Sequence, residues 1–239
     1  MPLNIEAFDN IIRGVENLRK YGVKYGLLSV LDKKIIGQEQ SFYDFVRSIS
    51  DSIRLNFVVP YGLGEENVET ISHEDLLELS KSLGVLYDLW KNDKSGERPF
   101  IVLPFAEMAQ SLVNQNVNTC AFSEDGCQGV ISISNDGSVY SCGRFSEDVD
   151  FLMGNIFDHS FNEILNSDVA KKRARRLCHI KAECSNCKYI KVCNGGCAQE
   201  AYAINNDYYK KTPYCSLYLS LFSKIEQDVN TMLALRKNL

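Results

Sequence analysis

The sequence predicts an α/β protein in which an incomplete parallel (β/α) barrel fragment is followed by a small cysteine-rich domain with a β-hairpin and helices. Helical and strand-like segments alternate through the first half, as they do in the right-handed crossover units of a parallel sheet. All nine cysteines lie at or after residue 120, so the composition divides the chain in two. We therefore expect two domains, residues 1–116 and residues 117–239.

Apolar residues of the first half recur at either helical or strand spacing. Helical spacing predicts helices over 5–22, 41–49, 72–90 and 105–113. Gly22 ends the first of these helices, and Ser72–Asp75 resembles a capping box. Compact apolar runs predict strands over 23–31 and 53–60.

Two strands do not complete a parallel sheet. A closed barrel of this type needs roughly 250 residues, far more than the first half contains. Unpaired strand edges are an aggregation hazard, so such edges are normally covered. We expect the first half to be a fragment of a larger α/β fold that another chain or a second copy completes. The alternative is a small α/β lobe packed on the second half.

Composition narrows the class of protein. A net charge of −5 argues against a general nucleic-acid binder. The sequence shows no signal peptide and no apolar run approaching the roughly 18–20 residues of a membrane span. We therefore expect a cytoplasmic protein in a reducing compartment, where cysteines are more often metal ligands than disulfides.

A hairpin is predicted near the start of the second half. Asn135-Asp136-Gly137 is a strong turn signal between short alternating segments at 129–134 and 138–141. Cys127 precedes the hairpin and Cys142 closes it, so both sulfurs are expected at the same end.

Helices are predicted for the rest of the second half. Ser160–Glu163 forms a capping-box pattern that opens a helix reaching about Arg176. A short helix is expected over 197–205, and a long final helix is expected from Cys215.

Four cysteines fall in a short polar segment that cannot bury a core of its own. They follow the spacing Cys184-x2-Cys187-x5-Cys193-x3-Cys197. Only a metal or a disulfide would organise so tight a set of thiols. Gly195 and Gly196 would let the main chain approach closely, with amide N–H groups directed at sulfur. The pattern predicts a metal-cluster loop.

The cysteine pattern as a whole resembles the SPASM domain, the auxiliary-cluster domain of many radical S-adenosylmethionine (SAM) peptide and protein maturases. The pattern runs Cys127-x9-Gly137-x4-Cys142, then Cys184-x2-Cys187-x5-Cys193-x3-Cys197, then Cys215. Segments 139–145, 152–156 and 194–197 are similar to the same family. Residues 8–22 and the strands after them resemble the later β/α units of the radical SAM partial barrel.

The resemblance implies two [4Fe–4S] clusters. The first would be held by Cys120, Cys127, Cys142 and Cys197, and the second by Cys184, Cys187, Cys193 and Cys215. Crossing of one cysteine to a neighbouring cluster also occurs in two-cluster ferredoxins. Cys120 stands outside the seven-cysteine motif. Cys178 is left over and is expected to be a buried or half-buried thiol.

One departure from the family bears on function. Radical SAM enzymes bind their catalytic cluster through a Cys-x3-Cys-x2-Cys loop, and residues 1–119 contain no cysteine. The resemblance thus implies that this chain does not cleave SAM alone, and that SAM is a cofactor only if a partner chain completes the barrel. A split enzyme, a truncated product and a protein retired from radical chemistry remain open. In some family members an acidic residue directly follows the cysteine equivalent to Cys142 and serves as a base. Here Gly143 follows, so no catalytic residue is assigned.

The leading hypothesis is the C-terminal portion or subunit of a radical SAM/SPASM maturase that acts on a ribosomal peptide or protein. Its expected partners are an N-terminal radical SAM half or a homo-oligomer mate, the peptide substrate, and a flavodoxin- or ferredoxin-type electron donor. Neither nucleic acid nor membrane is expected. A non-catalytic electron-transfer or peptide-recruiting module and a structural zinc protein are the alternatives. The basic run Lys171–Arg176 is interpreted as a solvated helix end, with a docking patch as its alternative.

Overall fold

The computed structural model describes residues 5–59, 61, 73–95, 99–115, 119–125 and 127–237. The chain forms two compact units, Met1–Ala106 and Glu107–Leu239. The helix α4 (Phe105–Asn114) runs across this division. The domain boundary expected after residue 116 stays a prediction.

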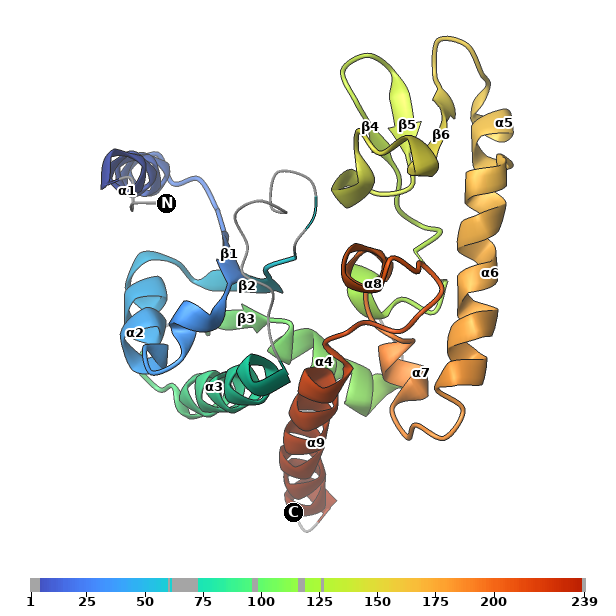
Figure 1. The fold of residues 1–239 in the computed structure, drawn as a ribbon. Helices are drawn as coiled ribbons and strands as arrows, with labels where there is room; N and C mark the ends of the chain where they lie inside the picture. Colours follow the sequence, from blue (N-terminus) through green and yellow to red (C-terminus); the bar gives the residue numbers. More distant parts are fainter. Residues whose placement is uncertain are drawn as a thin grey trace. The chain divides into compact units, whose positions relative to one another are not determined.

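The first unit alternates helix and strand, as predicted (Figure 1). Besides the start of α4, its main elements are α1 (Ile5–Lys20), β1 (Leu27–Leu31), α2 (Glu39–Ile49), β2 (Ser52–Phe57), α3 (His73–Asn92) and β3 (Ile101–Leu103). The strands pair in the order β1-β2-β3, and both pairs are parallel. The predicted α/β class with a parallel sheet is confirmed.

The two faces of the parallel sheet differ in burial. In β2, Ile53, Leu55 and Phe57 are buried and alternate with half-buried polar residues. On β1, Leu28 and Val30 are 66% and 57% exposed. Since alternate residues of a strand point to opposite faces, one face of the sheet carries the core and the other is open at β1.

Sequence patterns missed the third parallel strand. β3 has three residues, too few to show a period, and it is held by pairing with β2 rather than by its own pattern. The predicted first strand is also shorter, because pairing begins only at Leu27. The predicted capping box at Ser72 and the predicted strand end at Pro60 lie outside the described residues.

The second unit combines a small antiparallel sheet with helices. The sheet has the order β4-β5-β6. After α4, the strands and α-helices are β4 (Ser132–Ile133), β5 (Ser138–Tyr140), β6 (Leu152–Asn155), α5 (Phe161–Leu165), α6 (Asp168–Glu183), α7 (Ile190–Cys193), α8 (Ala198–Asn205) and α9 (Cys215–Lys237).

The predicted hairpin is present. Ser132 pairs with Tyr140 and Ile133 with Val139. Gly137 closes the turn with φ +81°, a conformation that glycine adopts readily. The sequence did not predict β6, which adds a third strand, and its Met153 packs with Val139 in the small core of this sheet.

The predicted helix from Ser160 to Arg176 is instead two helices. The Ser160–Glu163 capping box is confirmed, but α5 ends at Leu165. α6 starts after Ser167, whose hydroxyl accepts the Ala170 N–H at 3.3 Å. A second N-cap thus interrupts the helix, since such side chains satisfy the free N–H groups of a new helix start.

An aromatic cluster anchors the cysteine loop to α9. Phe122 lies edge-on to Tyr218, with ring centroids 5.0 Å apart. The centroid of the Phe122 ring is also 5.5 Å from that of Phe222. Tyr189 stacks on Phe222 at 5.2 Å. The apolar face of α9 is therefore the core of this part of the unit. Within the described parts of the chain, every helix is too short or too polar to traverse a bilayer.

Candidate metal centre

Four of the predicted ligands surround one pocket in the second unit. The pocket is small, with a volume of about 20 Å³, and its thiols are Cys184, Cys187, Cys193 and Cys215. Cys184 caps the end of α6, Cys193 ends α7 and Cys215 begins α9. Helix ends thus bring together residues that lie up to 31 positions apart in the sequence (215 − 184 = 31). We call these four residues the second thiol group.

The backbone between the sulfurs takes a left-handed course. Asn194, Gly195 and Gly196 have φ of 47°, 78° and 72°. The Asn194 side-chain amide donates to the Phe122 carbonyl at 2.9 Å, which holds this turn in the core. Burial raises the pKa of Cys193 to about 12, and a hydrogen bond from the Gly195 N–H opposes this rise. The expectation that the glycines let the main chain approach sulfur is confirmed at this residue.

The other four predicted ligands also lie near one another. We call Cys120, Cys127, Cys142 and Cys197 the first thiol group. A hydrogen bond between the thiols lowers the pKa of Cys120 and raises that of Cys127. The charges of Cys142 and Cys197 also act on Cys120. The Cys142 sulfur accepts the Arg144 N–H at 3.4 Å, as the N-cap of a short 3-10 helix.

Cys197 is the buried member of the first thiol group. It is the N-cap residue of α8, and burial raises its pKa to about 12. Its sulfur accepts a hydrogen bond from Nη1 of Arg144 at 3.5 Å. A guanidinium donor directed at sulfur stabilises the thiolate form.

Two arginines beside the first thiol group correct an interpretation made from the sequence. The run Lys171–Arg176 is not simply a solvated helix end, because Arg173 and Arg176 are 3% and 2% exposed. Arg173 donates to the Val130 carbonyl at 2.7 Å. Arg176 donates to the carbonyls of Tyr208 and Lys210 at 3.0 and 3.1 Å. Both positive charges lower the pKa of Cys127, against the larger effects that raise it.

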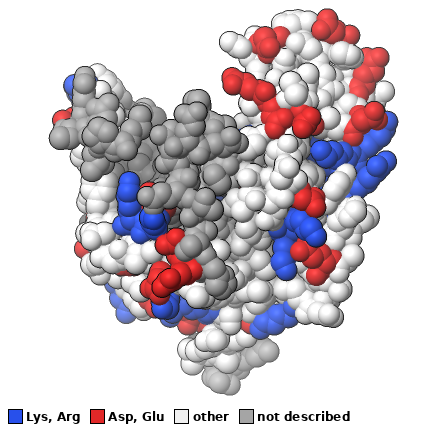
Figure 2. Space-filling view, viewed as in Figure 1, with Lys and Arg blue, Asp and Glu red and all other residues white. Residues whose placement is uncertain are grey.

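The spacing of these arginines carried a signal that the sequence interpretation missed. Arg173, Arg176 and Ile180 are buried on one face of α6, at the spacing of neighbours along a helix. Lys171 and Arg175 are exposed on this helix. Basic side chains gather over the α6 region in Figure 2, and acidic side chains cover the region of β4 to β6.

Cys178 differs from its expected place. It is exposed on α6 rather than buried or half-buried, because it lies two residues from Arg176 and so faces away from the buried side. His179 packs its ring on Tyr209, with centroids 4.4 Å apart. Tyr208 is buried.

The donor set fits a metal group. Thiolates are soft ligands that suit iron–sulfur clusters and zinc. Ile190, Leu219 and Phe222 supply apolar walls to the second thiol group, which limits solvent access. Since most of these thiols have raised pKa values, metal binding would release protons. Among the described residues, no three Cys, His, Asp or Glu side chains gather closely enough to hold a single ion.

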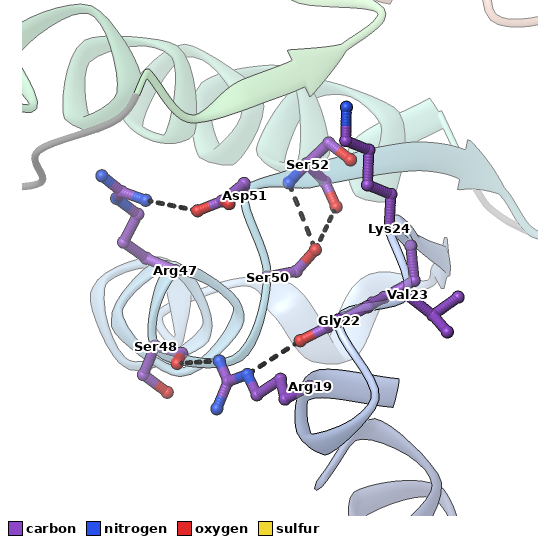
Figure 3. Close-up of a pocket in the computed structure, with 10 residues that line it drawn as sticks. Arg19, Gly22, Val23, Lys24, Arg47, Ser48, Ser50, Asp51 and Ser52 are labelled. Carbon is purple, nitrogen blue, oxygen red and sulfur yellow. Dashed lines mark hydrogen bonds and ion pairs between the residues drawn. The ribbon is translucent and has the colours of Figure 1, made fainter. Parts of the chain in front are cut away.

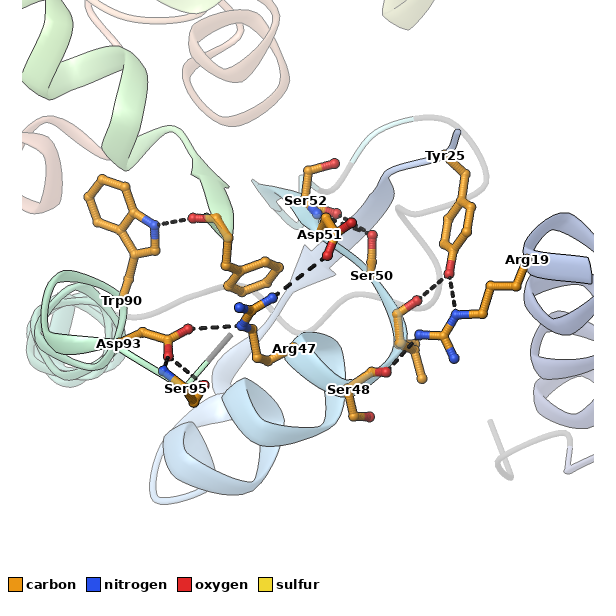
Figure 4. Close-up of polar contacts among 12 residues, drawn as sticks. Arg19, Tyr25, Arg47, Ser48, Ser50, Asp51, Ser52, Trp90, Asp93 and Ser95 are labelled. Carbon is orange, nitrogen blue, oxygen red and sulfur yellow. Dashed lines mark hydrogen bonds and ion pairs between the residues drawn. The ribbon is translucent and has the colours of Figure 1, made fainter. Parts of the chain in front are cut away.

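A second pocket lies in the first unit, before the amino ends of β1 and β2 (Figure 3). The guanidinium groups that line it, those of Arg19 and Arg47, already make contacts within the protein (Figure 4). Arg19 donates to the Ser48 carbonyl at 2.7 Å and to the Tyr25 hydroxyl at 2.9 Å. Arg47 pairs with Asp93 at 2.9 Å and lies 5.2 Å from the Phe100 ring centroid. These contacts join α1 and α2 to each other and to the segments before β1, after α3 and before β3, and we assign this pocket a structural role.

A family model supports the metal-cluster interpretation of the second unit. The sequence model of the SPASM family, described as "Iron-sulfur cluster-binding domain", matches residues 125–197. Residues 125–197 therefore match the SPASM domain, and the resemblance to SPASM-domain radical SAM maturases is confirmed.

Similarity to individual proteins extends beyond that domain. The chain is 25% identical over 230 residues to the cysteine-type anaerobic sulfatase-maturating enzyme of Clostridium novyi (strain NT), covering 91% of this chain and 58% of the relative. It is 24% identical over 231 residues to the Fe-coproporphyrin III synthase of Methanosarcina barkeri (strain Fusaro / DSM 804), covering 88% and 57%. The chain thus spans less than two thirds of the length of these relatives.

A solved structure shows the same fold. "Native anSMEcpe with bound AdoMet and Kp18Cys peptide" superposes with a TM-score of 0.75 at 20% identity, covering 97% of this chain and 63% of that one. The likeness includes the parallel sheet of the first unit as well as the SPASM domain, so the predicted fold of a partial barrel followed by a SPASM domain is confirmed.

Proposed function

We propose that this chain binds two [4Fe–4S] clusters and forms the C-terminal portion of a radical SAM/SPASM enzyme that modifies a peptide or protein. The first thiol group would hold one cluster and the second thiol group the other. The observation that carries this proposal is the pocket lined by Cys184, Cys187, Cys193 and Cys215. The interactions of Cys120 with Cys127, Cys142 and Cys197 support the other set. The compartment would be reducing and cytoplasmic.

The protein's own residues prepare both sites for such groups. Gly195 and Arg144 direct N–H donors at Cys193 and Cys197, which favours the thiolate forms that bind iron. Helix ends fix the positions of Cys184, Cys193 and Cys215 before a metal group arrives. A cluster with four thiolate ligands, when bound, supplies one-electron transfer rather than an open iron for substrate.

SAM chemistry would need a further polypeptide segment. Residues 1–119 contain no cysteine, so this sequence holds no Cys-x3-Cys-x2-Cys loop. We propose that the loop comes from a polypeptide that also completes the sheet beside β1. Exposed Leu28 and Val30 on that strand are consistent with a covering partner. This chain alone would not cleave SAM.

The substrate is proposed only as a class. A peptide accompanies AdoMet in the solved structure, and the Clostridium novyi relative is named as a sulfatase-maturating enzyme. The Methanosarcina barkeri relative has nearly the same identity and a name that points to different chemistry. We therefore propose a peptide or protein substrate without choosing the modification. An electron donor of the flavodoxin or ferredoxin class would serve the proposed clusters.

Metal analysis of anaerobically purified full chain tests the cluster proposal. Eight iron and eight sulfide per chain are expected for two [4Fe–4S] clusters. Replacement of Cys193 by Ser should reduce both contents by about half, whereas Cys178→Ser should change neither. Zinc in place of iron and sulfide would support the structural zinc alternative and overturn the proposal.

Co-expression tests the enzymatic part of the proposal. A polypeptide that carries the Cys-x3-Cys-x2-Cys loop and the first barrel strands is expected to copurify with this chain and to restore SAM cleavage. A loaded chain that binds peptide or exchanges electrons, but gains no SAM cleavage with such a partner, would support a non-catalytic module instead.

A further inference from the structure

An ion pair lies between the two thiol groups. The Nη1 atom of Arg144 is 3.5 Å from the Cys197 sulfur and 3.9 Å from Oε1 of Glu200. One guanidinium therefore contacts a proposed cluster ligand and a carboxylate at the same time. The Glu200 side chain is buried, at 6% exposure, and the Arg144 side chain is 41% exposed.

The same carboxylate is held from the side of the second thiol group. The Thr212 hydroxyl donates to Oε2 of Glu200 at 2.6 Å, and the Tyr218 hydroxyl donates to Oε1 at 3.5 Å. Thr212 and Tyr218 also line the pocket of the second thiol group. Glu200 thus accepts hydrogen bonds from two residues that line the second thiol group, and it pairs with Arg144, which contacts Cys197 of the first thiol group.

Packing leaves little freedom to these groups. Thr212 is 1% exposed, and its N–H donates to the Gly195 carbonyl at 2.8 Å. A Cβ atom on Gly196 would collide with the Thr212 side chain, so this glycine permits the contact. A buried charge without a partner is strongly unfavourable. These donors offset part of the burial of Glu200, although burial still raises the pKa of its carboxyl.

Donors to cysteine sulfur are known determinants of cluster potential. Net charge, hydrogen bonds to sulfur and solvent exposure together set the reduction potential of an iron–sulfur centre. A positively charged donor favours the more negative, reduced state.

We propose that Arg144 is a positioning residue for the iron–sulfur centre of the first thiol group, that Glu200 holds it against Cys197, and that this pair raises the reduction potential of that centre. The inference rests on the proposed ligand set. Arg144 is not itself a proposed ligand. Glu200, Thr212 and Tyr218 link it to the walls of the second thiol group.

The test is an anaerobic redox titration of the loaded full chain, followed by electron paramagnetic resonance, with iron and sulfide measured on each sample. Arg144→Met should lower the ratio of reduced to oxidised first centre at least tenfold at a fixed solution potential, which is about 59 mV for a one-electron centre. Arg144→Lys keeps the charge but loses the planar fork, so it should give a smaller shift in the same direction. The exposed Arg175 provides the matched control, since Arg175→Met removes an arginine from the same unit without removing a donor to sulfur.

The centre that shifts is assigned in a Cys184→Ser background, where only the first thiol group is complete. The role of Glu200 is tested by combining Glu200→Gln with Arg144→Met. If Glu200 acts through Arg144, Glu200→Gln shifts the midpoint by different amounts with and without Arg144. Equal shifts in both backgrounds would overturn the role given to Glu200.

The outcomes separate this inference from the function on which it rests. Unchanged midpoints in Arg144→Met at full iron content would overturn the inference and leave the cluster proposal intact. A loss of iron with no midpoint shift in the remaining centre would show a structural role only. If Arg144→Met retains too little iron to titrate, the midpoint potential of Arg144→Lys at full iron content is used instead. An unchanged midpoint there would likewise overturn the inference. An absence of iron and sulfide from the wild-type chain would instead overturn the proposed function.

Discussion

A Cβ atom placed on Gly195 would lie 2.6 Å from Cγ2 of Ile180. Ile180 is fully buried on α6 and two further atoms of its side chain lie within 3.0 Å of the same point, so it has little room to move aside. Gly195 also has φ +78°, which L side chains rarely adopt. The cysteine loop can therefore pass α6 at this distance only with glycine.

Gly195→Ala should destabilise the chain by about 2 kcal/mol or more, because overpacking adds to the backbone strain. It should also lower the iron content, since Cys193 and Cys197 flank this turn. Urea unfolding and metal analysis measure the two effects. Gly14→Ala is the matched control: nothing lies near its Cβ position in α1, and helix propensity predicts a gain of up to about 1 kcal/mol. Equal stability of the two variants would contradict the packing account.

Arg176 should be more important for stability than its charge suggests. Its replacement by Met leaves the carbonyl of the buried Tyr208 and the part-buried carbonyl of Lys210 without these donors, and we expect a loss of about 2–3 kcal/mol in the free energy of unfolding. Arg176→Lys should restore only part of this stability, because an ammonium cannot reproduce the planar donor fork. The exposed neighbour gives the comparison: Arg175→Met should change stability by no more than about 0.5 kcal/mol. Chemical unfolding of the three variants checks the order.

Asp93 should make the stability of the first unit depend measurably on pH in the acid range. Hydrogen bonds from Ser95 are the main reason that its pKa falls from 3.8 to about 2. Burial opposes this shift, whereas Tyr43 and Arg47 add to it. A carboxyl with a lowered folded pKa contributes stability above its unfolded pKa, and this contribution is lost as pH falls through the folded value. The relevant range is therefore from about pH 4 down to about pH 2.

Asp93→Asn should thus destabilise the chain by about 1–3 kcal/mol near pH 6, because hydrogen bonds to a charged acceptor are lost. The difference between the two proteins should shrink as pH falls below about 4. Unfolding curves of both proteins across this range check the prediction, and loss of metal in acid affects both alike. A difference that stays constant from pH 6 to pH 2 would contradict a charge-dependent role.

Thiol labelling should separate the leftover cysteine from the proposed ligands. Cys178 is exposed and outside both thiol groups, so it should react with iodoacetamide in the loaded protein. After the metal is removed by a chelator and the chain is unfolded in urea, all nine cysteines should become reactive. Mass spectrometry of labelled peptides gives the count. Cys120 is the informative case because it is also exposed. Its protection in the loaded chain would support its role as a ligand, and rapid labelling there would remove it from the set.

Much of the fold could be predicted from local pattern. Period and capping residues predicted α1, α2, α4 and the Ser160–Glu163 box, since these signals act within a few residues. The strands β3 and β6 escaped prediction because three or four residues show no reliable period. The break between α5 and α6 escaped because the capping box at Ser160 was taken as the start of one long helix.

The candidate site divides in the same way. The cysteine spacing alone predicted a metal-binding loop, because few structures other than a metal site require four thiols in so short a polar segment. The burial of Arg173 and Arg176 could not be predicted from the sequence, because a charged side chain such as arginine is usually exposed. The contact between Arg144 and Cys197 joins residues 53 positions apart, beyond the reach of any local pattern.

The sequence by itself determined that this chain alternates helix and strand and then carries a cysteine-rich domain of the SPASM type. Tertiary structure alone decided which thiols share a pocket, which arginines are buried beside them, and that Glu200 lies between the two thiol groups. The physical reason is that spacing and periodicity act along the chain. Burial, charge pairing and hydrogen bonds to sulfur arise only where distant segments meet.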